Sequence, residues 1–435
     1  MFALKAALVV VLVLIALYLC WLAVERANQR PHLGILSLFV WLAVFVLFID
    51  NPETLVVNVG GINIVGADVL CSFLAGIATL RLLQGRAEIA RLFRIPLVLL
   101  VGLLLFSYAR GVIAFGLQPA TNEFREFFYF LSALAFTLSF KVEQLATRVP
   151  SLAVIGAALL VAVGLVRIPM MGGFGLEERA VPSYAALAMG QAFFFGWAWT
   201  QFSDGARIWR WPIFGFLLFA FLMLHRSVWV ALACGFVVLL AVDRAERKSL
   251  LFAVALAGGV GGIVIALFLG DKVVDGLNQA VGEATASEGS TFMWRVEGWL
   301  ALLRPDENWN IPNLLIGHPM GSGYARTLGN SVLTSNDIES GIIPHNYYVS
   351  LILRGGILGV TALVLLYTSL IKVLIANRRS PEPHVYSICF LAILVTQLVY
   401  YIPYSADMIQ GVFLGGGIVF ASALCLSSFR TSFAV

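Results

Sequence analysis

Residues 95–115, IPLVLLVGLLLFSYARGVIAF, hold one charged side chain, Arg110, in 21 positions. An α-helix needs about 20 apolar residues to cross a bilayer, so this stretch predicts a membrane-spanning helix. Similar apolar stretches follow one another along the chain, separated by connectors with charged, glycine or proline residues. Together with residues 95–115 they make thirteen candidate spans: 6–24, 33–49, 64–79, 127–140, 151–166, 184–202, 208–224, 227–242, 250–270, 351–376, 385–402 and 408–427.

The composition supports a polytopic membrane protein. Of the 435 residues, 60% are hydrophobic and 12% are charged, whereas about 25% are charged in a typical soluble domain. The five cysteines lie in apolar stretches without a CxxC pair, which argues against a disulfide scaffold, a zinc site or a redox dithiol. The net charge of +4 is spread along the chain, so nucleic-acid binding has no support. The chain also lacks a GxxxxGK phosphate loop, which argues against nucleotide hydrolysis.

The basic residues predict an orientation in the membrane. Most of the 28 lysines and arginines lie in alternate short connectors, which marks those connectors as cytoplasmic. The long hydrophilic segment 271–344 then lies outside the cytoplasm. With a cytoplasmic carboxyl terminus, thirteen spans would place the amino terminus outside, which does not suit a chain that has Lys5 ahead of its first apolar stretch. We therefore expect that one early candidate does not cross and that about twelve helices span the membrane. The predicted organisation is N-terminal transmembrane helices in residues 1–270, a large external loop with amphipathic helices in residues 271–344, and C-terminal transmembrane helices in residues 345–435.

Several arginines on the external side are candidates for binding an anion. Arg226 lies in a very short connector between two apolar stretches, and no carboxylate lies within ten residues of it. Arg295 belongs to the sequence STFMWRVEGW, which predicts an amphipathic helix in the external loop. Arg179 follows two glutamates in another external connector. A guanidinium can bind a phosphate through two parallel hydrogen bonds, so such residues from separate loops suit a diphosphate. Three further arginines share the external side: Arg110, Arg125 and Arg167.

His345 is the candidate for acid–base chemistry. It follows Pro344 at the start of the span that ends the external loop. An imidazole titrates near neutrality, so it can accept a proton from a hydroxyl nucleophile at this position. The pair Gly355-Gly356 predicts a break between a short interfacial helix and the full span. The sequence contains no DxD or HExxH motif, and adjacent acids along a loop are weak evidence for a metal site, so no metal site is predicted.

These residues, in this order, resemble the bacterial superfamily of O-antigen ligases and O-antigen polymerases. The resemblance depends on His225-Arg226-Ser227 at the opening of a span and on Arg295 in the external loop. It continues with the LLIG sequence that ends at Gly317, with Gly321-Ser-Gly323, and with Pro344-His345-Asn346 leading into RGGILG at residues 354–359. In motif terms it covers roughly residues 184–376, and in hydropathy it covers the whole chain.

The resemblance implies an all-α, GT-C-like glycosyltransferase of about twelve transmembrane helices with one large periplasmic loop in the bacterial inner membrane. It implies an inverting transfer of glycan from undecaprenyl diphosphate without a metal or another cofactor. In a ligase the acceptor is a sugar hydroxyl of the lipid A-core oligosaccharide. The family's catalytic histidine corresponds to His345, and its diphosphate-binding arginines correspond to Arg226 and Arg295, with Arg179 as a weaker correspondence.

Three functions are consistent with the sequence. An O-antigen ligase is the first. A polymerase of the same superfamily, whose acceptor is another lipid-linked repeat unit, is the second. A transporter or flippase of lipid-linked glycan is the third, but transporters usually carry inverted repeats and polar sites at the membrane midplane. Here the polar candidates lie at the external face, which favours an enzyme.

Overall fold

A computed structural model describes most of the chain. The described residues are 30–50, 55–59, 62–145, 149–170, 180–202, 210–223, 225–242, 251, 255, 259, 263, 291–304, 309–323, 326–328, 331–333, 344–377 and 384–432. Arg179 and the first predicted span lie outside these residues, as does nearly all of the span predicted at residues 250–270.

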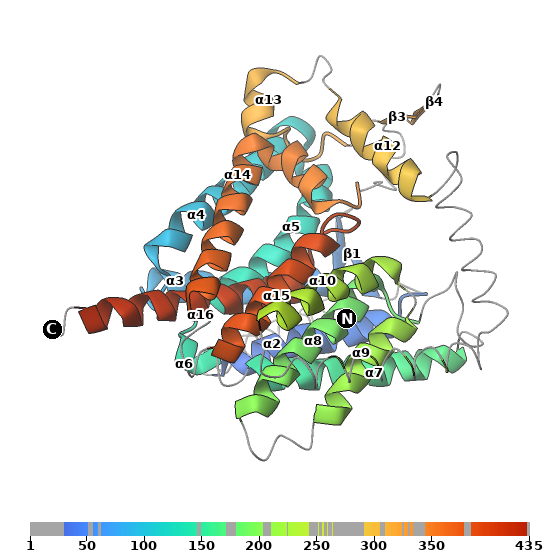
Figure 1. Cartoon of the computed structure of the whole chain (residues 1–435). Helices are drawn as coiled ribbons and strands as arrows, with labels where there is room; N and C mark the ends of the chain where they lie inside the picture. The colour runs from blue at the N-terminus through green and yellow to red at the C-terminus, as the bar shows by residue number, and fades with distance from the viewer. Residues whose placement is uncertain are drawn as a thin grey trace, which may run out of the picture.

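Helices make up most of the described chain (Figure 1). In order, the elements are α2 (Pro31–Leu47), β1 (Val56–Val59), β2 (Ile62–Val65), α3 (Gly66–Leu83), α4 (Arg91–Phe115), α5 (Leu117–Leu138), α6 (Val142–Leu145), α7 (Val149–Met170), α8 (Ser183–Phe202), α9 (Arg210–Leu222), α10 (Arg226–Val242), α12 (Thr291–Leu303), α13 (Ile311–Ile316), β3 (Arg326–Leu328), β4 (Ser331–Leu333), α14 (Tyr347–Ala376), α15 (His384–Tyr400) and α16 (Met408–Ser432). The two strand pairs are short antiparallel hairpins that the all-α prediction did not include.

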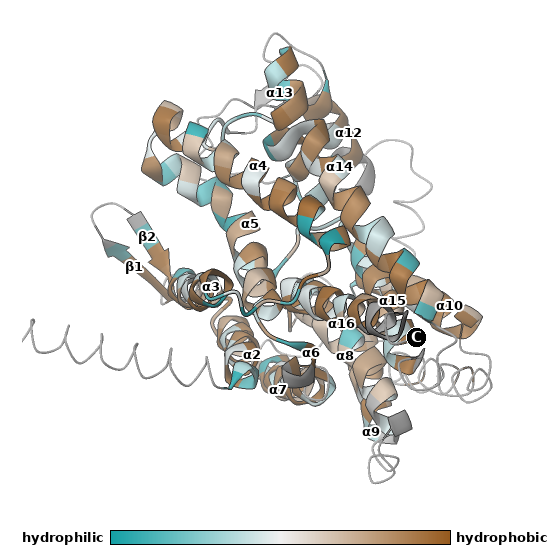
Figure 2. Cartoon of the chain, turned by 90° about the vertical axis from the view of Figure 1, so that its left-hand side faces the viewer, coloured by the Kyte–Doolittle hydropathy of each residue, from teal (hydrophilic) through white to brown (hydrophobic). Residues whose placement is uncertain are grey.

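Five of the described helices are long and apolar enough to cross a membrane. They are α3, α4, α7, α14 and the part of α16 from Met408 to Leu426. Several shorter apolar helices accompany them, and Figure 2 shows hydrophobic residues along most of the helices. On α4, Ile95 is 75% exposed and Ile113 is 87% exposed. Such apolar side chains at the surface of a long helix suit contact with lipid. The protein is therefore a helical, multi-pass membrane protein.

The helices pack in pairs that bring distant parts of the sequence together. The closest pairs are α5 with α16, α10 with α15, α4 with α14, and α7 with α8. The small helices α12 and α13 lie at the top of the molecule in Figure 1, at the end where α14 begins. There Trp299 and Leu302 of α12 pack on Val349 and Leu353 of α14 as a small apolar cluster of their own.

The predicted break in α14 is confirmed. Gly356 has φ 63° and ψ −165°, which interrupts the helix. The end of α13 lies directly against this break. A Cβ on Gly356 would lie only 2.3 Å from the carbonyl carbon of Leu315. A Cβ on Gly317 would in turn lie 2.4 Å from the carbonyl carbon of Arg354. Only glycines permit two backbones to approach this closely, and so the external loop packs directly on the broken helix.

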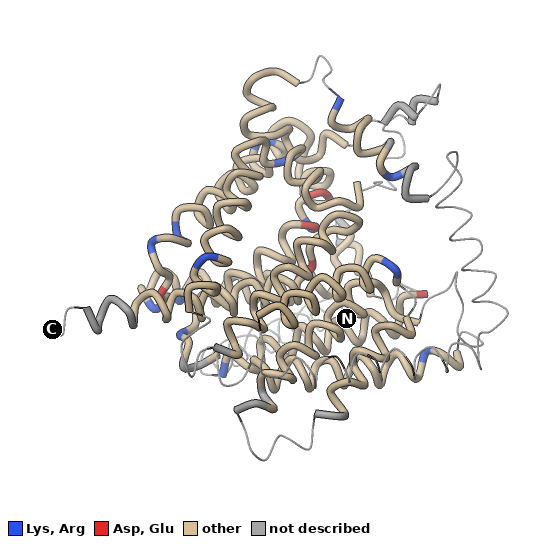
Figure 3. Tube along the Cα trace, in the orientation of Figure 1, with Lys and Arg blue, Asp and Glu red and all other residues tan. Residues whose placement is uncertain are grey.

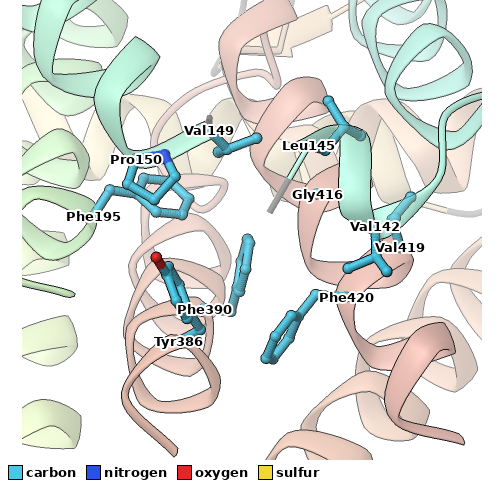
Figure 4. A pocket seen from close by; sticks show the side chains of 10 residues that line it. All are labelled: Val142, Leu145, Val149, Pro150, Phe195, Tyr386, Phe390, Gly416, Val419 and Phe420. Carbon is cyan, nitrogen blue, oxygen red and sulfur yellow. The ribbon is translucent and has the colours of Figure 1, made fainter. Parts of the chain in front are cut away.

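Aromatic side chains fill the interior between α6, α8, α15 and α16 (Figure 4). The rings of Phe195 and Phe390 meet edge to face with centroids 5.2 Å apart, and Phe390 stacks on Phe420 at 5.5 Å. The free volume between them is about 10 Å³, near the lower limit for one water molecule. This region is packed core and has no room for a substrate.

Candidate functional site

The turn Tyr400–Asp407 between α15 and α16 is the centre of the candidate site. The backbone N–H of Tyr347, the first residue of α14, donates to the carbonyl oxygens of Tyr401 and Tyr404 at 3.0 and 3.2 Å. The start of α14 is thus fixed against this turn. His345 adjoins the start of α14, and two other segments contact the same turn: α12, which carries Arg295, and the start of α8.

His345 lies immediately before α14 and is exposed. Its φ of 47° is in the left-handed region, and it is the only such non-glycine residue in the described part of the chain. Both neighbours hold it there. The carbonyl oxygen of Pro344 accepts a hydrogen bond from Trp299 Nε1 at 2.6 Å, and the Asn346 side chain caps α14 by accepting from the N–H of Val349 at 3.0 Å. A strained backbone held by buried neighbours is typical of functional positions.

Arg295 reaches the turn from α12. Its Nη1 lies 3.5 Å from the carbonyl oxygen of Pro403, and its Cζ lies 5.7 Å from the centre of the Tyr404 ring. The side chain is half-buried, so part of its guanidinium stays accessible to a ligand. The amphipathic helix predicted around Arg295 is confirmed, and its buried Trp299 places it beside the residue that precedes His345.

Arg226 is the first residue of α10 and is exposed. Its neighbour His225 is buried and makes a hydrogen bond through Nε2 to the carbonyl oxygen of Val181 at 2.8 Å. Two residues further along, Ser183 Oγ lies 2.8 Å from the Tyr400 hydroxyl, and Tyr400 stacks on Tyr404 with centroids 4.9 Å apart. The start of α10 is therefore connected to the turn that Arg295 contacts.

The position of Arg226 has an electrostatic consequence. The N-terminus of a helix carries a partial positive charge, which favours an acidic side chain or a bound anion. The first turn of α10 contains no acidic residue and begins with an arginine instead. Two positive features at one exposed helix start favour the binding of an anion there.

The three further arginines that the sequence predicted on the external side have structural roles. Arg110 donates to the carbonyl oxygen of Gly317 at 2.9 Å and to Asn313 Oδ1 at 3.0 Å. Arg125 pairs with Asp68 at 2.9 Å, and Arg167 pairs with Asp50 at 2.9 Å. These three arginines hold neighbouring segments of the chain together, so they are not candidates for binding substrate.

Asp407 is the last residue of the turn, immediately before α16, and it was not identified as a candidate from the sequence. Its Oδ1 accepts hydrogen bonds from the N–H groups of Ile409 and Gln410 at 2.7 and 3.1 Å, which caps α16. Burial raises the pKa of its carboxyl to about 7, although these hydrogen bonds act to lower it. The sequence did offer a signal, because Asp407 is the only acidic residue after position 384.

A buried ion pair joins α14 to α5 next to the candidate site, and it was not identified from the sequence. Arg354 Nη2 lies 2.6 Å from Glu123 Oε2, and the same guanidinium donates to the carbonyl oxygens of Pro319 and Gly323 and to Ser322 Oγ. One turn along α5, Glu126 Oε1 accepts from Ser350 Oγ at 3.2 Å. Figure 3 shows acidic residues in the interior where α5 lies. The spacing of Glu123 and Glu126 on one helix face was the available signal.

Arg295 and the start of α14, which follows His345, thus meet at one turn. The start of α10, which carries Arg226, is linked to that turn through the segment Val181–Ser183. A site of this kind can bind an anion through the arginines and accept a proton from a hydroxyl through the histidine. Comparison of the sequence with known protein families and with functionally characterised proteins gives no match. The functional interpretation therefore rests on these residues and their geometry.

Proposed function

We propose that this protein is an O-antigen ligase. It transfers a glycan from undecaprenyl diphosphate to a sugar hydroxyl of lipid A-core at the periplasmic face of the bacterial inner membrane. The observation that carries the proposal is that the Arg295 helix and the start of α14 both contact the turn Tyr400–Asp407. The start of α10 is linked to the same turn through the segment Val181–Ser183. The resemblance in sequence assigns the candidate histidine and two of the candidate arginines to these same segments.

The wider architecture belongs to the proposal as well. About twelve membrane-spanning helices of GT-C-like arrangement would hold the large loop and the start of α14 at the periplasmic surface. Donor, acceptor and product are all lipid-anchored, so a site at the membrane surface suits the reaction. Arg179 belongs to a connector that the sequence predicts on the same side, and it would assist the other arginines with the diphosphate.

The proposed reaction is a single displacement. Negative charge grows on the diphosphate as the bond from the anomeric carbon to the phosphate oxygen breaks. Arg226 and Arg295 stabilise that charge more strongly in the transition state than in the bound donor. The hydroxyl oxygen of the acceptor attacks the anomeric carbon from the opposite face while His345 accepts its proton. Undecaprenyl diphosphate leaves, and the anomeric configuration is inverted.

The decisive experiment is reconstitution. Purified protein, lipid-linked glycan and lipid A-core are combined without nucleotide and in the presence of a chelator, and joined product is measured. Ligase activity produces glycan attached to the core. If lipid-linked glycan lengthens instead, the protein is the polymerase of the same superfamily. If neither product forms with correctly folded protein, the proposal fails.

Variants test the individual roles in that assay. Loss of one transition-state cation typically lowers the rate by about 10²–10³-fold, and this is the expected effect of Arg226→Ala and Arg295→Ala. Arg226→Lys keeps the charge without the planar pair of donors, so near-normal turnover would argue against bidentate binding. His384→Ala is the matched control for His345 variants, because His384 begins α15 at the end opposite to Tyr400. It should retain the wild-type rate.

A further inference from the structure

A groove separate from the candidate site runs along the first half of α4. It lies between the end of α3, the N-terminal half of α4 and the C-terminal half of α5, and its volume is about 710 Å³. This is within the range of about 300–1,000 Å³ that is common for sites that bind small molecules. The other end of α4 contacts the loop of the candidate site through Arg110, so the groove and the site occupy opposite ends of one helix.

The wall of the groove is almost entirely apolar and has a defined length. Arg94, Val98, Gly102 and Leu105 line it from α4, and Leu134 and Leu138 line it from α5. At a rise of 1.5 Å per residue, the distance along α4 from Arg94 to Leu105 is about 16 Å. The hydrocarbon core of a bilayer is about 30 Å thick, so the groove is about as long as one leaflet is deep.

The groove opens at one end onto positive charge. Arg94 lines it there, and its Nη2 donates to the carbonyl oxygen of Ile89 at 3.1 Å, which holds the guanidinium at the opening. Arg86 and Arg91 are exposed nearby in sequence. The one acidic residue in this connector, Glu88, is paired with Lys141 at 2.6 Å. Figure 3 shows basic residues on this end of α4.

Gly102 gives the groove its width. A Cβ built on this residue meets no other atom within 4 Å, so the space beside it is open. A side chain added there would begin in open space and would extend into the groove that Gly102 lines. Glycine at this position is not required by the packing of α4 on its neighbours.

We propose that this groove binds one acyl chain of an anionic membrane phospholipid, with the lipid phosphate at Arg94. The apolar wall is matched in length to a chain within one leaflet, and the arginine at its opening suits a phosphate. A donor lipid whose diphosphate lies at the candidate site would have its headgroup at the other end of α4. The proposal does not depend on the glycosyl-transfer activity.

Lipid binding to the purified protein tests the proposal. Native mass spectrometry in detergent compares phosphatidylglycerol, which is anionic, with phosphatidylcholine, which has the same acyl chains and no net charge. We expect one phosphatidylglycerol to bind with at least a tenfold preference over phosphatidylcholine. Arg94→Gln should abolish this preference, whereas Arg30→Gln, at an exposed arginine outside the groove, should leave it unchanged.

A second pair of variants tests the chain-binding part. Gly102→Phe should remove the bound lipid, whereas Gly76→Phe should retain it, because Gly76 on α3 also has no atom within 4 Å of a built Cβ and does not line the groove. If Gly102→Phe does not fold, Val98→Trp serves the same purpose at an exposed wall position. The proposal is overturned if wild type binds the two lipids equally or if Arg94→Gln keeps the preference for phosphatidylglycerol. It is also overturned if Gly102→Phe or Val98→Trp binds as much lipid as wild type. Stronger binding of undecaprenyl phosphate than of phosphatidylglycerol would overturn it too.

Discussion

Arg354 of α14 and Glu123 of α5 form a buried ion pair, with Nη2 and Oε2 2.6 Å apart and side chains 2% and 13% exposed. The same arginine donates to Pro319, Ser322 and Gly323 of the external loop. One guanidinium thus joins two helices to the loop that covers them. Because the α14 segment that carries it begins just after His345, this contact also fixes the start of α14.

Glu123→Gln should destabilise the protein strongly. Removing one charge of a buried pair leaves the other without its counter-charge, which typically costs about 3–5 kcal/mol. Ser322→Ala removes a single hydrogen bond to the same guanidinium and should cost about 1.5–3 kcal/mol. Thermal unfolding of the purified variants measures both effects. Equal melting temperatures of Glu123→Gln and wild type would show that the pair contributes little.

His345 variants should separate stability from activity. Asn tolerates a left-handed backbone better than other non-glycine residues do, so His345→Asn should fold like the wild type and lose glycan transfer. His345→Ala places a strained alanine at φ 47° and should be about 1 kcal/mol less stable than His345→Gly. Melting temperatures and the reconstituted transfer assay check these expectations. Transfer at the wild-type rate by His345→Asn would contradict the proton-accepting role.

Asp407→Asn should change how stability depends on pH. The folded protein raises the pKa of this carboxyl to about 7, whereas an unfolded chain returns it to about 3.9. Between about pH 4 and pH 7 the folded state therefore binds a proton that the unfolded state has released, so this residue's contribution to stability falls as the pH rises. Asn keeps the cap of α16 and does not titrate.

The measurement is the melting temperature of both proteins across this range of pH. The wild type should lose more stability than Asp407→Asn as the pH rises, because all other titrating groups are shared. Parallel curves for the two proteins would mean that Asp407 titrates as an ordinary carboxyl.

Gly317→Ala should disrupt the contact between the external loop and α14. Gly317 has φ 79°, and a Cβ would lie 2.4 Å from the carbonyl carbon of Arg354. Backbone strain and overpacking together predict a loss of about 2–4 kcal/mol. Gly76→Ala is the matched control in an exposed helical position and should stabilise by about 0.5–1 kcal/mol. Similar melting temperatures for the two variants would contradict the close packing of loop on helix.

Part of the candidate site was predictable from the sequence. His345 and Arg295 were identified by their positions at a helix start and in an amphipathic helix, and the structure has them on the segments expected. Asp407 and Glu126 were not identified, since a single carboxylate beside an apolar stretch does not show what it will contact. Arg110 and Arg125 were grouped with the candidate arginines because sequence alone does not reveal their partners.

The sequence by itself determined the membrane class, the long apolar helices within the described residues and the break at Gly356, but not the short helices α6 and α13. These features depend on apolar length and on glycine, which act locally along the chain. Only the tertiary structure decided which charged side chains hold helices together and which remain exposed to bind a ligand. Arg354 and Glu123 belong to helices far apart in sequence, and they meet where residues 319–323 also contact the guanidinium. Partners of a buried charge are fixed by packing, and packing depends on residues distant in the chain.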